Sequence, residues 1–144
     1  MGKWNFDKII KNFDLVKKEL PVKCGMDAVN YFRESFNTQS FDGKKWKEVQ
    51  RRISGTNAYK YPKGKGLSRR TRAILIKTGR LKRGIVLKKA SFNRTVIINE
   101  VPYASYHNEG TKHIPRRQFM NRTDTLDGRA IKIIKNTINK LFKK

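Results

Sequence analysis

Positive charge is the feature that most limits how this chain can fold. The sequence has 35 Lys and Arg residues against 11 Asp and Glu residues, which gives a net charge of +24 at pH 7. Repulsion among so many like charges opposes a compact monomer that has no acidic partner. The sequence therefore favours a protein that binds an acidic partner. This partner is a nucleic acid, an anionic surface or an acidic neighbouring subunit.

The charge is uneven along the chain. Residues 44–94 contain 18 Lys and Arg residues and one acidic residue, Glu48, a local net charge of +17. Within this segment, residues 44–72 show no helical or strand period and are rich in Gly, Lys and Arg, which predicts a long basic loop. Tyr59 and Tyr61 offer rings on which nucleic-acid bases stack. The arginines that we expect to contact a partner there are Arg69, Arg70 and Arg72.

Length and composition indicate one domain, residues 1–144, with enough aromatic residues to form a core. Cys24 is the only cysteine, so an internal disulfide is excluded and a reducing compartment is favoured. The first residues lack the apolar segment of a secretory signal, and the apolar runs are too short to span a bilayer. We therefore expect a protein made in a cytoplasm, with no membrane partner.

Apolar spacing predicts an α+β fold. Residues 5–19 and the stretch to about Phe36 carry apolar side chains every three or four residues, so we expect two helices that meet at Pro21 or one kinked helix. "GIVLKKASF" and "RTVIINEV" predict two antiparallel strands. The C-terminus predicts an amphipathic helix capped by Asp124 or Asp127. We expect N-terminal helices, a small antiparallel sheet with the long basic loop, and a C-terminal helix packed on the sheet.

Both histidines lie in "VPYASYHNEGTKHIPRRQF", residues 101–119. Their spacing, H-x-E-x-x-x-H, is not the H-E-x-x-H of a zincin, and no P-C-x-x-C follows to complete the zinc site of a nucleobase deaminase. The other acidic residues are scattered, so no carboxylate cluster indicates a magnesium-dependent nuclease. We expect His107 to hydrogen-bond locally and His113 to lie in a loop. A metal site of His107, Glu109 and His113 is the alternative.

Four separated stretches resemble one known family. They are "FDGKKW" (41–46), "LIKTGRLKRGI" (75–85), "YASYHNEGT" (103–111) and "IPRRQF" (114–119). In this order and spacing they resemble the phage virion morphogenesis proteins, also called tail completion proteins, which are related to head–tail connector and tail terminator proteins. The residues that match the family pattern are Phe41, Asp42, Gly43, Trp46, Thr78, Gly79, Leu81, Tyr103, His107, Gly110, Pro115 and Phe119.

The resemblance implies a small α+β structural protein that forms a ring of about six subunits at the head–tail junction or the tail end. It implies no catalytic residue, metal, cofactor or small-molecule substrate. The implied partners are further copies of the chain and other phage neck and tail proteins, with DNA in the channel as a further contact. The implied location is the virion, after assembly in the host cytoplasm. The side chains expected to face a subunit or partner are Arg69, Arg70, Arg72, Arg80, Arg116 and Arg117.

The same stretches make local predictions. We expect residues 78–81 to turn into a strand, with Gly79 supplying backbone freedom. Tyr103 and His107 are four residues apart and share a face if the segment is helical. Gly110 ends that helix, and Phe119 anchors the loop of residues 111–118 in the core.

Two other functions remain open from the sequence. The first is a nucleic-acid-binding protein that acts through residues 44–94, whose affinity would fall steeply with salt. The second is a basic metal-dependent nuclease, whose cleavage would be lost on changing His107 or Glu109.

Overall fold

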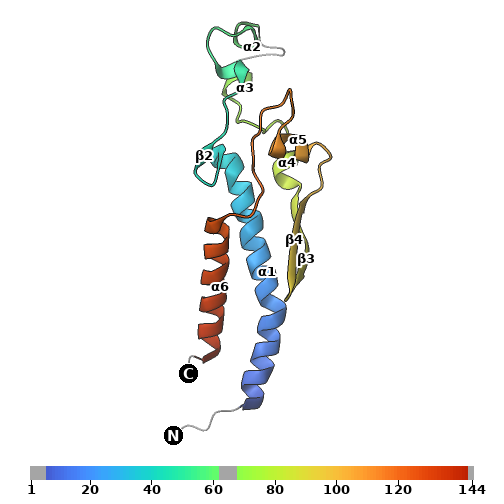
Figure 1. Ribbon diagram of the computed structural model, residues 1–144, viewed down its shortest axis with the longest axis vertical. Helices are drawn as coiled ribbons and strands as arrows, with labels where there is room; N and C mark the ends of the chain where they lie inside the picture. Colours follow the sequence, from blue (N-terminus) through green and yellow to red (C-terminus); the bar gives the residue numbers. More distant parts are fainter. Residues whose placement is uncertain (1–5, 62–67, 143–144) are drawn as a thin grey trace. The chain divides into compact units, whose positions relative to one another are not determined.

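The structure is a computed structural model that describes residues 6–61 and 68–142 (Figure 1). It confirms the predicted mixed α+β fold, with two-stranded antiparallel pairs and a C-terminal helix. In chain order the elements are α1 (Phe6–Thr38), β1 (Ser40–Phe41), β2 (Lys44–Lys45), the 3-10 helix η1 (Gln50–Arg52), α2 (Asn57–Lys60), α3 (Ser68–Thr71), α4 (Arg80–Arg83), β3 (Ile85–Ser91), β4 (Arg94–Asn99), α5 (Ala104–Glu109) and α6 (Asp124–Phe142).

The chain divides into two compact units that are interleaved along the sequence. Unit 1 comprises Met1–Tyr31, Val86–Ile98 and Arg122–Lys144, and unit 2 comprises Phe32–Ile85 and Asn99–Asn121. The chain therefore passes between the units within α1, at the start of β3, at the end of β4 and just before α6. The sequence predicts one domain, residues 1–144, and in the structure neither of the two units is one continuous piece of sequence.

α1 is one continuous helix of 33 residues with Pro21 inside it. Residue 5, with which the predicted helix begins, lies outside the described residues. A proline inside a helix removes one hydrogen bond and crowds the preceding turn, at a cost of about 3 kcal/mol. Leu20, Pro21 and Ala28 are all buried. The apolar face thus continues past the proline, and its burial offsets the local cost of Pro21.

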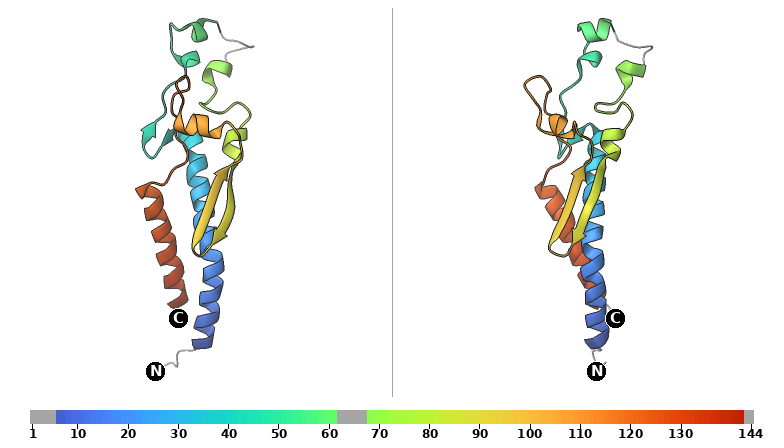
Figure 2. Two further views of the ribbon diagram at one scale, coloured as in Figure 1. Left: turned by 45° about the vertical axis from the view of Figure 1, so that its right-hand side comes forward. Right: turned by 90° about the vertical axis from the view of Figure 1, so that its right-hand side faces the viewer.

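In unit 1, the β3–β4 hairpin and α6 both pack against α1 (Figures 1 and 2). A Cβ atom placed on Gly25 would lie 2.6 Å from a methyl group of Leu87 and 3.0 Å from that of Thr95, so the hairpin touches the helix backbone closely. On α6, Arg129 donates two hydrogen bonds, of 2.8 and 2.6 Å, to the carboxylate of Asp27. A glycine on α1 and an ion pair thus hold the two other elements of unit 1 in place.

Thr123 caps α6, so the prediction that Asp124 or Asp127 does so is wrong. The Thr123 hydroxyl accepts a hydrogen bond of 3.2 Å from the backbone N–H of Leu126, and its carbonyl accepts one of 3.0 Å from Asp127. Asp124 and Asp127 lie in the first turn instead, where a negative charge is favoured by the helix dipole.

Phe36, at the C-terminal end of α1, is the centre of the core of unit 2 and is fully buried. Its ring meets Trp46 edge-on, with the centroids 5.4 Å apart, and meets Phe119 at 5.1 Å. Aromatic pairs at these separations contribute roughly 0.5–1.5 kcal/mol beyond the area that they bury. Other buried side chains of this unit are Phe32, Phe41, Ile74, Leu81, Ile85, Val101 and Ala104.

Residues 44–72 are not the structureless loop that the sequence predicts. The segment begins with β2, which pairs with β1 in an antiparallel register that places Phe41 opposite Lys44. It continues through the short helical turns η1, α2 and α3. Turns this short are below the length that periodicity detects. Residues 62–67 of this segment lie outside the described residues.

Residues 78–81 turn into a helix and not into a strand. Gly79 has a φ of 74°, in the left-handed region that favours glycine, and α4 begins at Arg80. Leu81 is buried from within this helix, and β3 starts only at Ile85. The apolar run that reads as one strand is therefore divided between a helical turn and a strand.

Candidate partner interface

The four stretches that carry the family resemblance all belong to unit 2 and lie against one another. Trp46 donates a hydrogen bond of 2.6 Å from its indole nitrogen to the carbonyl of Gln118, which joins the first stretch to the last. A Cβ atom placed on Gly110 would lie 2.8 Å from the backbone nitrogen of Arg116, so the third stretch touches the last through a glycine. Segments up to 72 residues apart in sequence thus form one assembly.

α5 confirms that Tyr103 and His107 share a face and that Gly110 ends the helix, but the buried Nδ1 of His107 makes none of the local hydrogen bonds expected of that side chain within the described residues. Tyr103 and His107 lie on one face, with ring centroids 5.9 Å apart and planes at 90°. Gly110 ends the helix with a φ of 81°, and Phe119 is buried. His107 accepts a backbone hydrogen bond of 2.8 Å from Arg117 at its carbonyl, which ties α5 to the loop that follows.

Asn108 holds this region together, a role that the sequence does not predict. Its side-chain oxygen accepts hydrogen bonds of 2.9 and 3.0 Å from the backbone N–H groups of Phe119 and Met120, and its amide donates one of 3.0 Å to the Met120 carbonyl. One asparagine therefore replaces the hydrogen bonds that a strand partner would supply. No sequence pattern marks Asn108. Its neighbours His107 and Glu109 are the residues whose side chains suggest metal binding.

Arg117 does not lie on the surface as expected. The residue is buried, its Nε donates 2.9 Å to the carbonyl of Lys47, and one Nη donates 3.4 Å to that of Glu48. A buried guanidinium needs such acceptors because an unpaired one is costly. Arg117 therefore holds the last stretch to the chain that follows β2.

Arg51 and Arg52 hold the basic segment together by hydrogen bonds to backbone carbonyls. The sequence does not predict this role, because the segment contains many other arginines and lysines. Arg51 donates to the carbonyls of Arg69, Arg72 and Ala73 at 3.0, 2.9 and 3.3 Å. Arg52 donates to those of Arg70, Thr71 and Arg72 at 3.2, 3.1 and 3.0 Å. The two guanidinium groups thus satisfy the carbonyls at and just after the end of α3.

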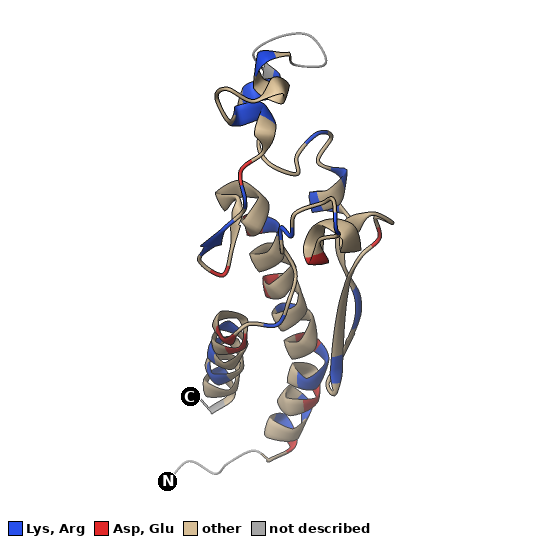
Figure 3. Cartoon of the chain, turned by 45° about the horizontal axis from the view of Figure 1, so that its top comes forward, with Lys and Arg blue, Asp and Glu red and all other residues tan. Residues whose placement is uncertain are grey.

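The other residues predicted to contact a partner differ in their exposure and in the contacts that they already make. Arg70 lies over the ring of Tyr59, 4.3 Å from its centroid, and donates 2.6 Å to the Tyr59 carbonyl, so this ring face is already occupied. Tyr61 is 75% exposed. Arg80 and Arg116 are exposed, and Arg116 donates 2.8 Å to the side chain of Gln118. Arg69 and Arg72 are half-buried, and Figure 3 shows the Lys and Arg residues of η1 and α3 close together.

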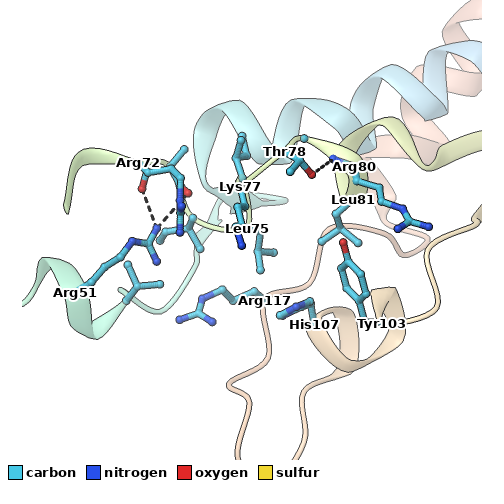
Figure 4. A pocket seen from close by; sticks show the side chains of 15 residues that line it. Arg51, Arg72, Leu75, Lys77, Thr78, Arg80, Leu81, Tyr103, His107 and Arg117 are labelled. Atoms are coloured by element: carbon cyan, nitrogen blue, oxygen red, sulfur yellow. Dashed lines mark hydrogen bonds between the residues drawn. The ribbon is translucent and has the colours of Figure 1, made fainter. Parts of the chain in front are cut away.

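A pocket of about 290 Å³ lies in unit 2 where the second and third stretches meet η1 (Figure 4). Its walls come from residues 49 and 51, from the turn of residues 72–81, and from α5 with Arg117. Two buried nitrogen atoms in this lining, Nδ1 of His107 and Nε of Arg72, have no hydrogen-bond partner in the part of the chain that the structure describes. The pocket therefore brings together three of the predicted arginines, Arg72, Arg80 and Arg117, with His107.

The electrostatics of the pocket reflect burial and crowding of like charges. Burial lowers the pKa of His107, and the neighbouring Arg117 lowers it further, which favours the neutral imidazole. Burial also lowers the pKa of the Arg117 guanidinium. The pKa of Arg51 is lowered by burial first and then by Arg72 and other arginines nearby.

The described residues contain no group of three or more His, Cys, Asp and Glu side chains placed to hold a metal ion. His113 and Glu109 are exposed, whereas His107 is half-buried against Tyr103. Cys24 is half-buried on α1, and burial followed by Asp27 raises the pKa of its thiol. Among the described helices, none has both the length and the apolar character needed to cross a membrane.

Comparison of the chain with protein family models, with curated proteins and with solved structures found no match.

Proposed function

We propose that this chain is a structural protein of a phage virion, located at the neck or tail end, which forms a homo-oligomeric ring that completes the tail and joins it to the head. The observation that carries the proposal is two exposed apolar surfaces, one on α1 and one on α6, that no other described part of unit 1 covers. The motif stretches of unit 2 support it through their resemblance to tail completion proteins. The proposal includes no catalytic role.

The apolar stripe of α1 continues beyond the elements that cover it. Phe6, Ile10 and Phe13 follow one another at spacings of four and three residues and are 70%, 60% and 43% exposed. The same helical face continues into the buried residues Leu20 and Ala28. An apolar stripe that is buried at one end of a helix and exposed at the other marks a surface that a further protein subunit covers.

α6 carries a second exposed apolar surface. Ile131, Ile134 and Ile138 recur every three or four residues and are 52%, 36% and 37% exposed. Two different apolar surfaces on one chain suit the head-to-tail contacts of a ring, in which one face of a subunit meets another face of the next. Neighbouring copies of the chain are thus the occupants that we propose for both helices.

The net charge of +24 opposes association of identical copies. At physiological ionic strength, however, charges separated by more than about 8 Å are largely screened from one another. The remaining repulsion is lowest when an acidic partner contacts the ring, which suits docking onto another virion protein through residues 44–72.

Sedimentation velocity tests the ring. We expect the protein to sediment as an oligomer of several subunits, and Ile10→Asp to shift it to smaller species while circular dichroism keeps its helical signal. Asn30→Asp is the matched control, because it makes the same change of charge at an exposed polar position of α1. A native protein that stays monomeric at about 100 µM, or an Asn30→Asp variant that dissociates equally, would contradict the proposal.

Nucleic-acid binding is the second candidate, and the +17 charge of residues 44–94 favours it. Its mark is the dependence of affinity on salt, with a slope of log K against log [salt] of about −0.9 for each phosphate neutralised on duplex DNA. A flat dependence in a titration of duplex DNA would exclude it.

A further inference from the structure

The pocket of unit 2 combines a cationic lining with apolar walls. No Asp or Glu side chain is part of its lining, which contains five Lys and Arg residues: Arg51, Arg72, Lys77, Arg80 and Arg117. The apolar walls are formed by Val49, Ala73, Ile74, Leu75, Ile76 and Leu81. A solvated basic surface would not need such walls, so the pocket suits a group that is anionic at one end and apolar beside it.

The arginines of the pocket are already held in position. The carbonyls of Arg69, Arg72 and Ala73 fix Arg51, and those of Lys47 and Glu48 fix Arg117. Each guanidinium uses its Nε and one Nη in these bonds, which leaves the second Nη without a protein partner among the described residues. Donors held in this way lose little side-chain freedom when an anion binds.

The pocket also concentrates positive charge, and its lining contains no acidic side chain to neutralise it. The Arg51 pKa is lowered by burial and by Arg72, Arg52 and Arg69, which shows that like charges crowd one another here. Glu48 is the nearby acid and raises the pKa of Arg51 and Arg117 against these effects, but burial and the arginines outweigh it at Arg51, and its carboxylate is 3.5 Å from Arg52 and outside the lining. An anion bound in the pocket would relieve this crowding, because opposite charge favours the protonated guanidinium.

We propose that this pocket binds a side-chain carboxylate of an acidic segment of a partner protein, with an apolar residue of that segment against the walls formed by Val49, Leu75 and Ile76. Lys77 and the free nitrogens of Arg51 and Arg117 receive the carboxylate. The inference rests on the proposed function only in that unit 2 docks an acidic protein. Ring formation through α1 and α6 is not required for it.

Two observations favour a protein segment over a nucleic acid as the occupant. A phosphodiester is flanked by polar sugar oxygens, which would leave the apolar walls of the pocket facing polar groups, whereas a carboxylate on an aliphatic stem matches both. The ring of Tyr59, one of the two candidate stacking residues, is covered on one face by Arg70. Base stacking contributes much of the sequence-independent affinity for single strands, and this ring face is not open to it.

Fluorescence anisotropy with a short labelled peptide that alternates Glu and Leu tests the pocket. The full chain should bind this peptide, and Lys77→Glu should weaken binding about tenfold. Lys77 is exposed and makes no hydrogen bond to another described residue, so its replacement should leave the fold intact. Lys132→Glu, which makes the same charge change on α6 in unit 1, is the matched control and should change affinity by less than about twofold.

The peptide itself supplies the test of the apolar walls. Replacing its leucines by serines keeps the charge and cannot alter the fold of the protein, and it should weaken binding about tenfold as well. Duplex DNA of equal charge, added as a competitor, should displace the Leu-containing peptide less well than the unlabelled peptide does.

Each outcome decides the proposal. Equal loss of binding in the Lys77 and Lys132 variants would show that only total charge matters. It would contradict the proposal that the peptide binds in the pocket. Equal binding of the serine peptide would overturn the role of the walls. Stronger competition by DNA, sensitive to Lys77→Glu, would assign the pocket to nucleic acid instead. Sedimentation of the Lys77→Glu variant separates the two proposals. If the variant still sediments as an oligomer but no longer binds the peptide, the substitution has affected the pocket and not ring formation.

Discussion

Single side chains that bind backbone carbonyls and amides hold unit 2 together. Arg51, Arg52 and Arg117 donate to carbonyls, while Asn108 accepts from two backbone amides and donates to a carbonyl. These bonds take the place of a sheet, which the short strands of this unit cannot supply. Substitution of any of them would leave buried polar groups without partners, at a cost of about 1–3 kcal/mol for each group.

The sequence predicts which residues matter in this region better than it predicts what they do. Gly110 and Phe119 behave as expected because a glycine after a helix and a phenylalanine in a polar loop have few other uses. Arg117 was expected outside and lies inside, because its acceptors, the carbonyls of Lys47 and Glu48, are 70 and 69 residues away. Backbone acceptors carry no signature in the sequence, so such contacts cannot be inferred from it.

His107 should make the stability of the protein depend on pH. Its pKa is lowered in the folded state from an ordinary value of 6.5, by burial first and by Arg117 second. The unfolded chain therefore binds a proton more readily, and the free energy of unfolding falls as the pH drops through about 6.5 and levels off below the folded-state pKa. Urea unfolding at about pH 7.5 and about pH 5.5 should show this decrease, and His107→Gln should reduce it.

His113→Gln is the matched control, because His113 is the only other histidine and is exposed. It should keep the pH dependence of the native protein. If His107→Gln and His113→Gln show the same dependence as the native chain, the burial of His107 does not affect stability in this way.

At the scale of elements, long apolar periods were predictable and short turns were not. β3, β4, α5 and α6 lie where spacing and glycine positions place them. α4 and the turns within residues 44–72 could not be predicted, because a helix of three or four residues contains only about one turn and therefore shows no repeated spacing. The continuity of α1 through Pro21 also could not be predicted, since it depends on packing by elements that come later in the chain.

The glycines of α1 and α6 give a contrast that tests the packing of unit 1. Gly128 has open space around it, so Gly128→Ala should raise the free energy of unfolding by about 0.5–1 kcal/mol through the higher helix propensity of alanine. Gly25 is in contact with Leu87 and Thr95 of the hairpin, so Gly25→Val should lower it by about 1–3 kcal/mol through overpacking.

Denaturant unfolding of both variants checks this contrast. A stabilised Gly25→Val would mean that the hairpin does not lie on α1 as described. A destabilised Gly128→Ala would mean that this position of α6 is covered by something outside the described contacts of the chain.

At the scale of the whole molecule, charge should govern how stability responds to salt. The net charge of +24 makes repulsion larger than the few surface ion pairs can balance. Adding sodium chloride from about 0.02 M to about 0.3 M screens that repulsion and should raise the midpoint of thermal unfolding. Scanning calorimetry at a fixed protein concentration checks this, and a midpoint that falls with salt would show that attractive ion pairs dominate.

The interleaving of the two units has a practical consequence for anyone who wishes to cut or label the protein. Because the chain changes units four times, a truncation at either of the two inner crossings, after Ile85 or after Ile98, removes parts of both units, and one at either outer crossing removes a terminal segment of unit 1. Two-residue hairpin turns are better places for insertion, and the one at Phe92 and Asn93, with Phe92 61% exposed, is the natural point for an epitope or a fluorophore. A protein with an insertion there should keep the fold of both units, whereas a fragment that ends at an inner crossing lacks parts of both.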